Sequence, residues 1–234
     1  MENSIKAYIA TLKELYRRIE ALNFSFPEYY EETIKLLFDP IKILCTTGSG
    51  NFQVIERVTI NKRVTKENLR IYEVDKVKYP PSEYVKKFGR ANLKGQSVLY
   101  ATFNFMTAIK EMKPDIGDLI TVSEWRTKNE KDGLIICPLF MKQPKDGSIN
   151  VNLLKLYNSF LSEIKRYPTE IASLMYEIHS FYANCFARKI DSANNQSYIF
   201  TALLADKIFN QYNDGTVDAI LYPSTQDELI TENI

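Results

Sequence analysis

The sequence predicts an α+β fold because two kinds of hydrophobic pattern alternate along the chain. Apolar residues recur every three or four positions near the N-terminus and again between residues 149 and 212, which is the spacing of amphipathic helices. Between these segments lie short runs rich in Val, Ile, Tyr and Thr, which are residue types favoured in strands. We therefore expect a mixed sheet with helices, preceded by a helical N-terminal extension.

The N-terminal extension is expected to contain two helices. The first covers residues 2–22, and its apolar stripe must pack against the body of the protein or against a partner. The second begins near Ser25, a helix-capping residue, and continues to Phe38, since Pro40 cannot continue it. The Gly/Ser-rich residues 46–51 predict a turn and a boundary between an extension, 1–50, and a catalytic domain, 51–234.

The remaining elements follow from residue type and from caps. Asn104 is expected to cap a short helix that Pro114 terminates, and longer helices are expected over residues 149–165, 169–189 and 196–212. The predicted strands cover residues 52–60, 69–74, 97–103, 118–125 and 218–223.

Composition narrows the classes of function. A formal charge of +1 gives no general reason to expect binding to nucleic acid or to an anionic membrane. The longest apolar run is too short to span a bilayer, and three widely spaced cysteines favour neither a disulfide framework nor a zinc site. We expect a cytoplasmic protein without a metal. His179 is the only histidine, and its apolar neighbours favour a structural role over catalysis.

Candidate binding residues begin with Arg70 and Tyr72. In a strand over residues 69–74, period-two alternation places both on one face, where an arginine and an aromatic ring can grip a phosphate and stack on a base. Arg57 and Arg63 are nearby competitors for the same role. A surface arginine in a salt bridge is the alternative interpretation.

A second group of candidates lies in residues 80–112 and at the last strand. Arg90 follows Gly89 in a loop that can approach a ligand closely, Tyr100 lies on the next predicted strand, and Glu111 lies on the helix after it. Ser224 comes after Pro223 at the carboxyl end of the last strand, where ligands often meet α/β sheets. The sequence thus predicts a cleft with an arginine, a tyrosine, a carboxylate and a hydroxyl. Singly, each of these residues also has a purely structural interpretation.

The order and spacing of these residues resemble the RES-domain family over roughly residues 65–234. The matching portions are LRIY, GRANLKGQSVLYATFNFMTAIKEMKPDIGD, and YIFTALLADKI followed by DGTVDAILYPS. The resemblance implies a fold akin to ADP-ribosyltransferases and degradation of NAD, often by the toxin of a toxin–antitoxin pair.

The resemblance also implies a role for each residue. Arg70 and Arg90 bind phosphates, Tyr100 shapes the nicotinamide pocket, Glu111 stabilises the ribosyl cation and Ser224 adds a hydrogen bond to a phosphate. The implied substrate is NAD, with inorganic phosphate as the favoured co-substrate, no separate cofactor, and a cognate antitoxin as the partner. Hydrolysis of NAD, transfer of ADP-ribose to a macromolecule, and NAD binding without turnover remain alternatives.

Overall fold

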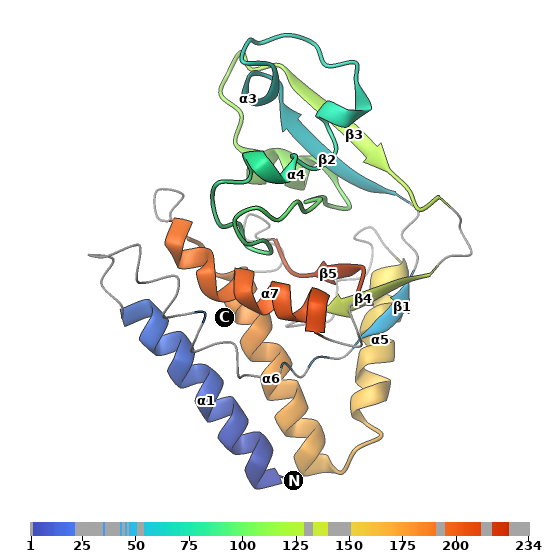
Figure 1. Cartoon of the computed structure of the whole chain (residues 1–234). Helices are drawn as coiled ribbons and strands as arrows, with labels where there is room; N and C mark the ends of the chain where they lie inside the picture. The colour runs from blue at the N-terminus through green and yellow to red at the C-terminus, as the bar shows by residue number, and fades with distance from the viewer. Residues whose placement is uncertain are drawn as a thin grey trace.

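The computed structural model describes residues 2–21, 35, 43, 45, 47–50, 54–128, 133–139, 151–190, 195–211 and 217–224. These residues form helices and two small sheets, in agreement with the predicted α+β class. The second N-terminal helix expected near Ser25–Phe38 lies outside the described residues apart from Lys35, which is helical. In Figure 1 one sheet, with α3 (Lys62–Thr65) and α4 (Phe105–Met112), lies above the other sheet and the long helices.

The long helices form the main hydrophobic core. They are α1 (Glu2–Ala21), α6 (Thr169–Ala187) and α7 (Ile199–Gln211), and α1 lies alongside α6 in Figure 1. The apolar stripe of α1 is buried, which confirms the expectation that this helix packs on the body of the protein. The buried residues that α1 contributes to this core are Ile9, Leu12, Leu15 and Ile19.

A three-stranded sheet borders this core. Its order is β1 (Gly48–Gly50), β4 (Leu134–Pro138), β5 (Ala219–Leu221), with β1 antiparallel and β5 parallel to the central β4. α5 (Val151–Ile164) packs on β1 and β4. The predicted strand near the C-terminus is confirmed by β5. β4 was not among the predicted strands, although its apolar run is typical of a strand that is buried in a sheet.

The turn expected over residues 46–51 is wrong in its centre, because Gly48–Gly50 forms β1. The glycines let this strand lie close to its neighbours: a Cβ atom on Gly50 would be 2.9 Å from Ile136 Cδ1, and one on Gly48 would be 3.2 Å from Leu156 Cδ2. A Gly/Ser-rich segment therefore serves here as a tightly packed strand and not as a linker. The division into domains at residue 50 stays a prediction.

The second sheet has two antiparallel strands, β2 (Ile55–Ile60) and β3 (Ile120–Trp125), which confirm two predicted strands. α3 (Lys62–Thr65) and α4 (Phe105–Met112) both contact β2. The predicted cap of α4 is also confirmed, since Asn104 Oδ1 accepts a hydrogen bond of 2.8 Å from the backbone N–H of Met106. α4 is the element that carries Glu111.

Two predicted strands do not form. Residues 69–73 have no regular structure and lead into a 3-10 turn, Val74–Lys76. The carbonyl of Leu69 accepts a hydrogen bond from Asn61 Nδ2 and not from a neighbouring strand, and the Leu69 side chain is exposed. In residues 97–103 only Thr102 pairs with a strand residue, Glu56, and the carbonyl of Tyr100 accepts a hydrogen bond from the Arg57 side chain instead of from a neighbouring strand. Strand-like composition did not ensure a ladder partner here.

None of the helices in the described ranges combines the length and the apolar character needed to cross a bilayer.

Candidate functional site

Glu111 and Ser224 are in direct contact. The Ser224 hydroxyl donates a hydrogen bond of 2.5 Å to Glu111 Oε1, although the two residues are 113 positions apart in the sequence. Glu111 lies in the last turn of α4 and is exposed, and Ser224 lies three residues after β5. A hydroxyl donor fixes the direction of the carboxylate that accepts its hydrogen bond. The fold therefore provides an oriented carboxylate that solvent or a ligand can reach.

Tyr222 connects this pair to the other candidates. Burial raises the pKa of Tyr222 above its ordinary value, the Tyr100 hydroxyl and the Glu111 carboxylate act in the same direction, and the charge of Arg90 opposes them. Its ring packs on Phe186, with ring centroids 5.1 Å apart. The Tyr222 hydroxyl is therefore within electrostatic range of Arg90, Tyr100 and Glu111. We call Arg90, Tyr100, Glu111, Tyr222 and Ser224 the Glu111 cluster.

Tyr100 holds the loop that precedes it. Its hydroxyl donates to Asn92 Oδ1 at 2.8 Å and accepts from the backbone N–H of Ala91 at 2.8 Å. A Cβ atom on Gly89 would lie 2.7 Å from this hydroxyl and closer still to Asn92 Oδ1, so this position requires glycine. Burial raises the pKa of Tyr100 to about 12, opposed by the hydrogen bond from Ala91 and by the charge of Arg90. Tyr100 is thus a neutral hydrogen-bonding group at physiological pH and not a base.

Arg90 ties the same loop to the end of α6. Its Nη1 donates to the carbonyl oxygens of Phe186 and of Arg188, the latter at 3.0 Å, and its guanidinium lies 5.3 Å from the centroid of the Tyr198 ring. A cation suits this position because the carboxyl end of a helix carries partial negative charge. The hydrogen bonds found among the described residues use one of the three guanidinium nitrogens. Arg90 therefore has a structural role. In its predicted role, the other two guanidinium nitrogens, Nε and Nη2, would bind the phosphate.

Arg70 and Tyr72 are not brought to the Glu111 cluster. Both are exposed, Tyr72 to 84%, and no described contact joins either of them to the cluster. Asn68 bonds to the backbone of Gly117 and Leu119, and this holds the segment at the end of β2 and β3. The period-two face expected for Arg70 and Tyr72 depended on a strand that does not form. Their roles in binding a phosphate and a base stay predictions.

His179 is a core residue, as its apolar neighbours indicated. It is 2% exposed, and its ring centroid lies 4.5 Å from that of Phe160. Burial lowers its pKa to about 4, opposed by a hydrogen bond with the backbone of Pro138.

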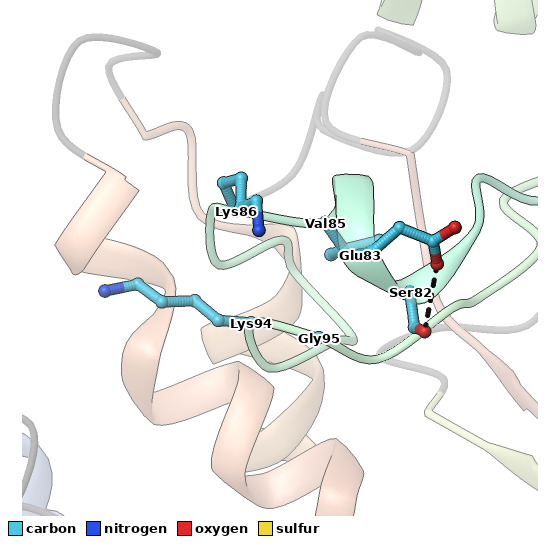
Figure 2. Close-up of a pocket in the computed structure, with 6 residues that line it drawn as sticks. All are labelled: Ser82, Glu83, Val85, Lys86, Lys94 and Gly95. Atoms are coloured by element: carbon cyan, nitrogen blue, oxygen red, sulfur yellow. Dashed lines mark hydrogen bonds between the residues drawn. The ribbon is translucent and has the colours of Figure 1, made fainter.

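Two cavities lie outside the Glu111 cluster. The larger is an open groove of about 460 Å³ on the loop that carries Arg90, and Figure 2 shows Ser82 and Glu83 at one end of it and Lys86 and Lys94 at the other. The smaller, of about 140 Å³, lies between β1 and α5. No residue of the Glu111 cluster lines either cavity.

Sequence reasoning overlooked two residues that the structure places at this site. Tyr222 is two positions before Ser224, but both follow the end of β5 at Leu221, so strand alternation does not place them together. Arg57 was noted only as a competitor of Arg70, but its Nη1 donates to the Tyr100 carbonyl at 3.0 Å. No pattern in the sequence indicates that contact, because it joins β2 to an irregular segment.

Comparisons with protein-family models, with curated proteins and with solved structures found no match to this chain.

Proposed function

We propose that the protein degrades NAD by cleaving the bond between nicotinamide and ribose at the Glu111 cluster, with inorganic phosphate as the acceptor. The observation that carries the proposal is the contact between Glu111 and Ser224. The two residues belong to separate sequence blocks, both of which resemble the RES-domain family. Their meeting supports the expectation that those blocks form one site.

The chemistry of NAD cleavage suits this set of residues. Nicotinamide leaves as a neutral molecule from a cationic ring, so the reaction needs no strong acid to protonate the leaving group. It needs an anion near the ribose carbon, where positive charge develops, and a carboxylate held in a fixed direction provides that. Glu111 fills this role, with Ser224 holding its carboxylate. The half-buried rings of Tyr100 and Tyr222 supply neutral surfaces on which a planar nicotinamide can stack.

Arginine binds the phosphates in this proposal. Arg90 lies in the Glu111 cluster, and its guanidinium provides paired donors that match phosphate oxygens. Arg70 keeps the same proposed role, which in the described structure requires its segment to move toward the cluster. Ser224 contributes a hydrogen bond to a phosphate only if it releases Glu111.

The finer classification belongs to the same proposal. We infer a RES-type fold, akin to the ADP-ribosyltransferases, and a cytoplasmic protein that acts as the toxin of a toxin–antitoxin or defence system. The inferred partner is an antitoxin that covers Glu111, since a cell that makes such an enzyme must block its access to NAD. A complex of the two that leaves Glu111 open to NAD would contradict this inference.

The substitution Glu111→Gln tests the proposal. It keeps the size of the side chain and removes the charge that stabilises the ribosyl cation, so nicotinamide release from NAD should fall by about two orders of magnitude or more. Release is measured by chromatography with saturating NAD. Glu124→Gln is the matched control, because Glu124 is also exposed but lies on β3, where its described ion pair is with Arg126.

The result separates the proposed reaction from its rivals. Near-normal nicotinamide release by Glu111→Gln would show that Glu111 takes no part in the reaction, and the proposal would be rejected. Label transferred from NAD to protein or nucleic acid identifies an ADP-ribosyltransferase. NAD bound by the wild-type protein without any release of nicotinamide identifies a binding module.

A further inference from the structure

One face of the sheet formed by β2 and β3 is polar beyond the pair Ile55 and Trp125, and it contains two unsatisfied groups. Arg57 and Thr59 lie on this face of β2, opposite Ser123 and Thr121 of β3. The Thr121 hydroxyl donates to Asn61 Oδ1 at 2.8 Å, and that of Ser123 donates to the Arg57 carbonyl at 3.4 Å. By contrast, Arg57 Nε and Thr59 Oγ1 are buried and find no hydrogen-bond partner within the described part of the chain.

Arg57 also lacks a counter-ion. No carboxylate of the described residues lies within ion-pair distance of its half-buried guanidinium, and burial alone lowers its pKa. A partly buried charge is costly unless an anion or a set of hydrogen bonds compensates for it. Here the compensation is one hydrogen bond, from Nη1 to the carbonyl of Tyr100. A bound anion at this position would stabilise the charge of the Arg57 guanidinium.

The position of this charge connects it to the Glu111 cluster. Tyr100 belongs to the cluster, and Arg57 touches its backbone. In addition, the residue before Arg57, Glu56, exchanges both backbone hydrogen bonds with Thr102, at 2.7 and 2.8 Å, so β2 and the Tyr100 segment are fixed to each other. Arg57 therefore holds a constant position relative to Tyr100.

We propose that Arg57 is an anion-binding residue of this site and takes two oxygens of the dinucleotide's pyrophosphate. A turn of the guanidinium toward the ligand gives Nε and one terminal nitrogen as parallel donors, which is the geometry that matches a phosphate group. The choice of pyrophosphate as the ligand rests on the proposed function. The observation of an unpaired charge beside Tyr100 is independent of that function.

Binding of ADP-ribose, which carries the pyrophosphate and lacks the bond that is cleaved, tests this assignment. Affinity is measured by titration calorimetry on the full chain. Arg57→Met keeps the length of the side chain and removes its charge, and it should weaken binding about tenfold or more, since a charge-assisted hydrogen bond is lost. Arg63→Met is the control and should leave the affinity unchanged, because Arg63 is exposed and its described hydrogen bond is to the Met112 carbonyl.

Arg57→Lys keeps the charge and removes the paired donors. It replaces Arg57→Met as the test variant if thermal melting shows that Arg57→Met does not fold. An affinity of either folded variant equal to that of the wild type overturns the assignment, and so does a wild-type protein that binds no ADP-ribose. Nicotinamide release from NAD is followed in parallel. If ADP-ribose binding depends on Arg57 but the wild-type protein releases no nicotinamide, NAD cleavage is rejected and the role of Arg57 stands. If the wild-type protein releases nicotinamide and Arg57→Met binds ADP-ribose with unchanged affinity, only the role of Arg57 is rejected.

Discussion

The hydroxyl of Tyr100 joins a strand-like segment to the loop that carries Arg90. It satisfies the backbone N–H of Ala91 and the side-chain oxygen of Asn92, two residues that are each 5% exposed. A buried donor that loses its partner costs more free energy than the hydrogen bond itself contributes. This oxygen atom is therefore one of the groups that hold the loop, beside the hydrogen bonds of Arg90 to the end of α6.

Tyr100→Phe removes that atom and keeps the ring. We expect the free energy of unfolding to fall by about 1–3 kcal/mol, since Ala91 N–H and Asn92 Oδ1 both lose a partner. Urea denaturation followed by circular dichroism measures the change. Tyr84→Phe is the control, because Tyr84 is 72% exposed. Equal stability of Tyr100→Phe and wild type would show that water replaces the hydroxyl.

Single residues also show how far the sequence predicted the site. Arg90, Tyr100, Glu111 and Ser224 were predicted together because they belong to compact blocks with characteristic spacing. The structure joins Glu111 to Ser224 and joins Tyr100 to the loop of Arg90, and their common role in one site stays a prediction. Arg70 was placed by the periodicity of a strand, and periodicity does not show whether a ladder partner exists. A contact such as that of Arg57 depends on the three-dimensional path of the chain, which no local pattern contains.

At the level of elements, α4 determines where Glu111 lies. The helix has eight residues, too few to be stable in isolation, so it depends on its cap and on its contact with β2. Asn104 closes its first turn by accepting from the N–H of Met106. The cap and the helix were both predictable, since Asn at this position and Pro114 after the helix are local signals.

Asn104→Ala should lower the free energy of unfolding by about 0.5–2 kcal/mol, because it removes the side-chain acceptor at the start of α4. Hydrogen exchange of the α4 backbone amides should become faster, since a short helix without a cap frays. Asn104→Ser keeps a capping oxygen and should lose little stability. If the Ala and Ser variants exchange at the same rate, the cap does not hold Glu111 in place.

Elements defined by long-range pairing were harder to predict than elements defined by caps. β1 consists of residues that usually form turns, and it is a strand because β4 and α5 press closely on its glycines. Residues 97–103 have the composition of a strand but find a partner at Thr102 alone among the described strands. In both cases tertiary contacts overrode the local preference.

At the level of the whole molecule, one buried histidine links folding to pH. His179 is the only histidine in the chain, and burial lowers its pKa in the folded protein from 6.5 to about 4. Between these values the unfolded chain binds a proton that the folded protein does not. The stabilisation is therefore complete above about pH 6.5 and is lost as the pH falls toward 4.

The loss should reach about 3 kcal/mol over that window, from the shift multiplied by the free energy of one pKa unit. Urea denaturation at intervals between pH 7 and 5 measures the slope, at pH values where most carboxylates remain charged. In His179→Gln this part of the pH dependence should disappear, whatever the absolute stability of the variant. An equal slope in both proteins would mean that folding does not change the pKa of His179.

The acceptor in the proposed reaction is the central claim, and one measurement tests it most directly. The purified full-length protein is incubated with NAD, with and without inorganic phosphate, and the products are identified by mass spectrometry. We predict nicotinamide release that depends on phosphate, together with phosphorylated ADP-ribose. ADP-ribose formed at the same rate in both samples would contradict phosphorolysis and identify a glycohydrolase, and intact NAD in both samples of a folded protein would contradict NAD cleavage itself.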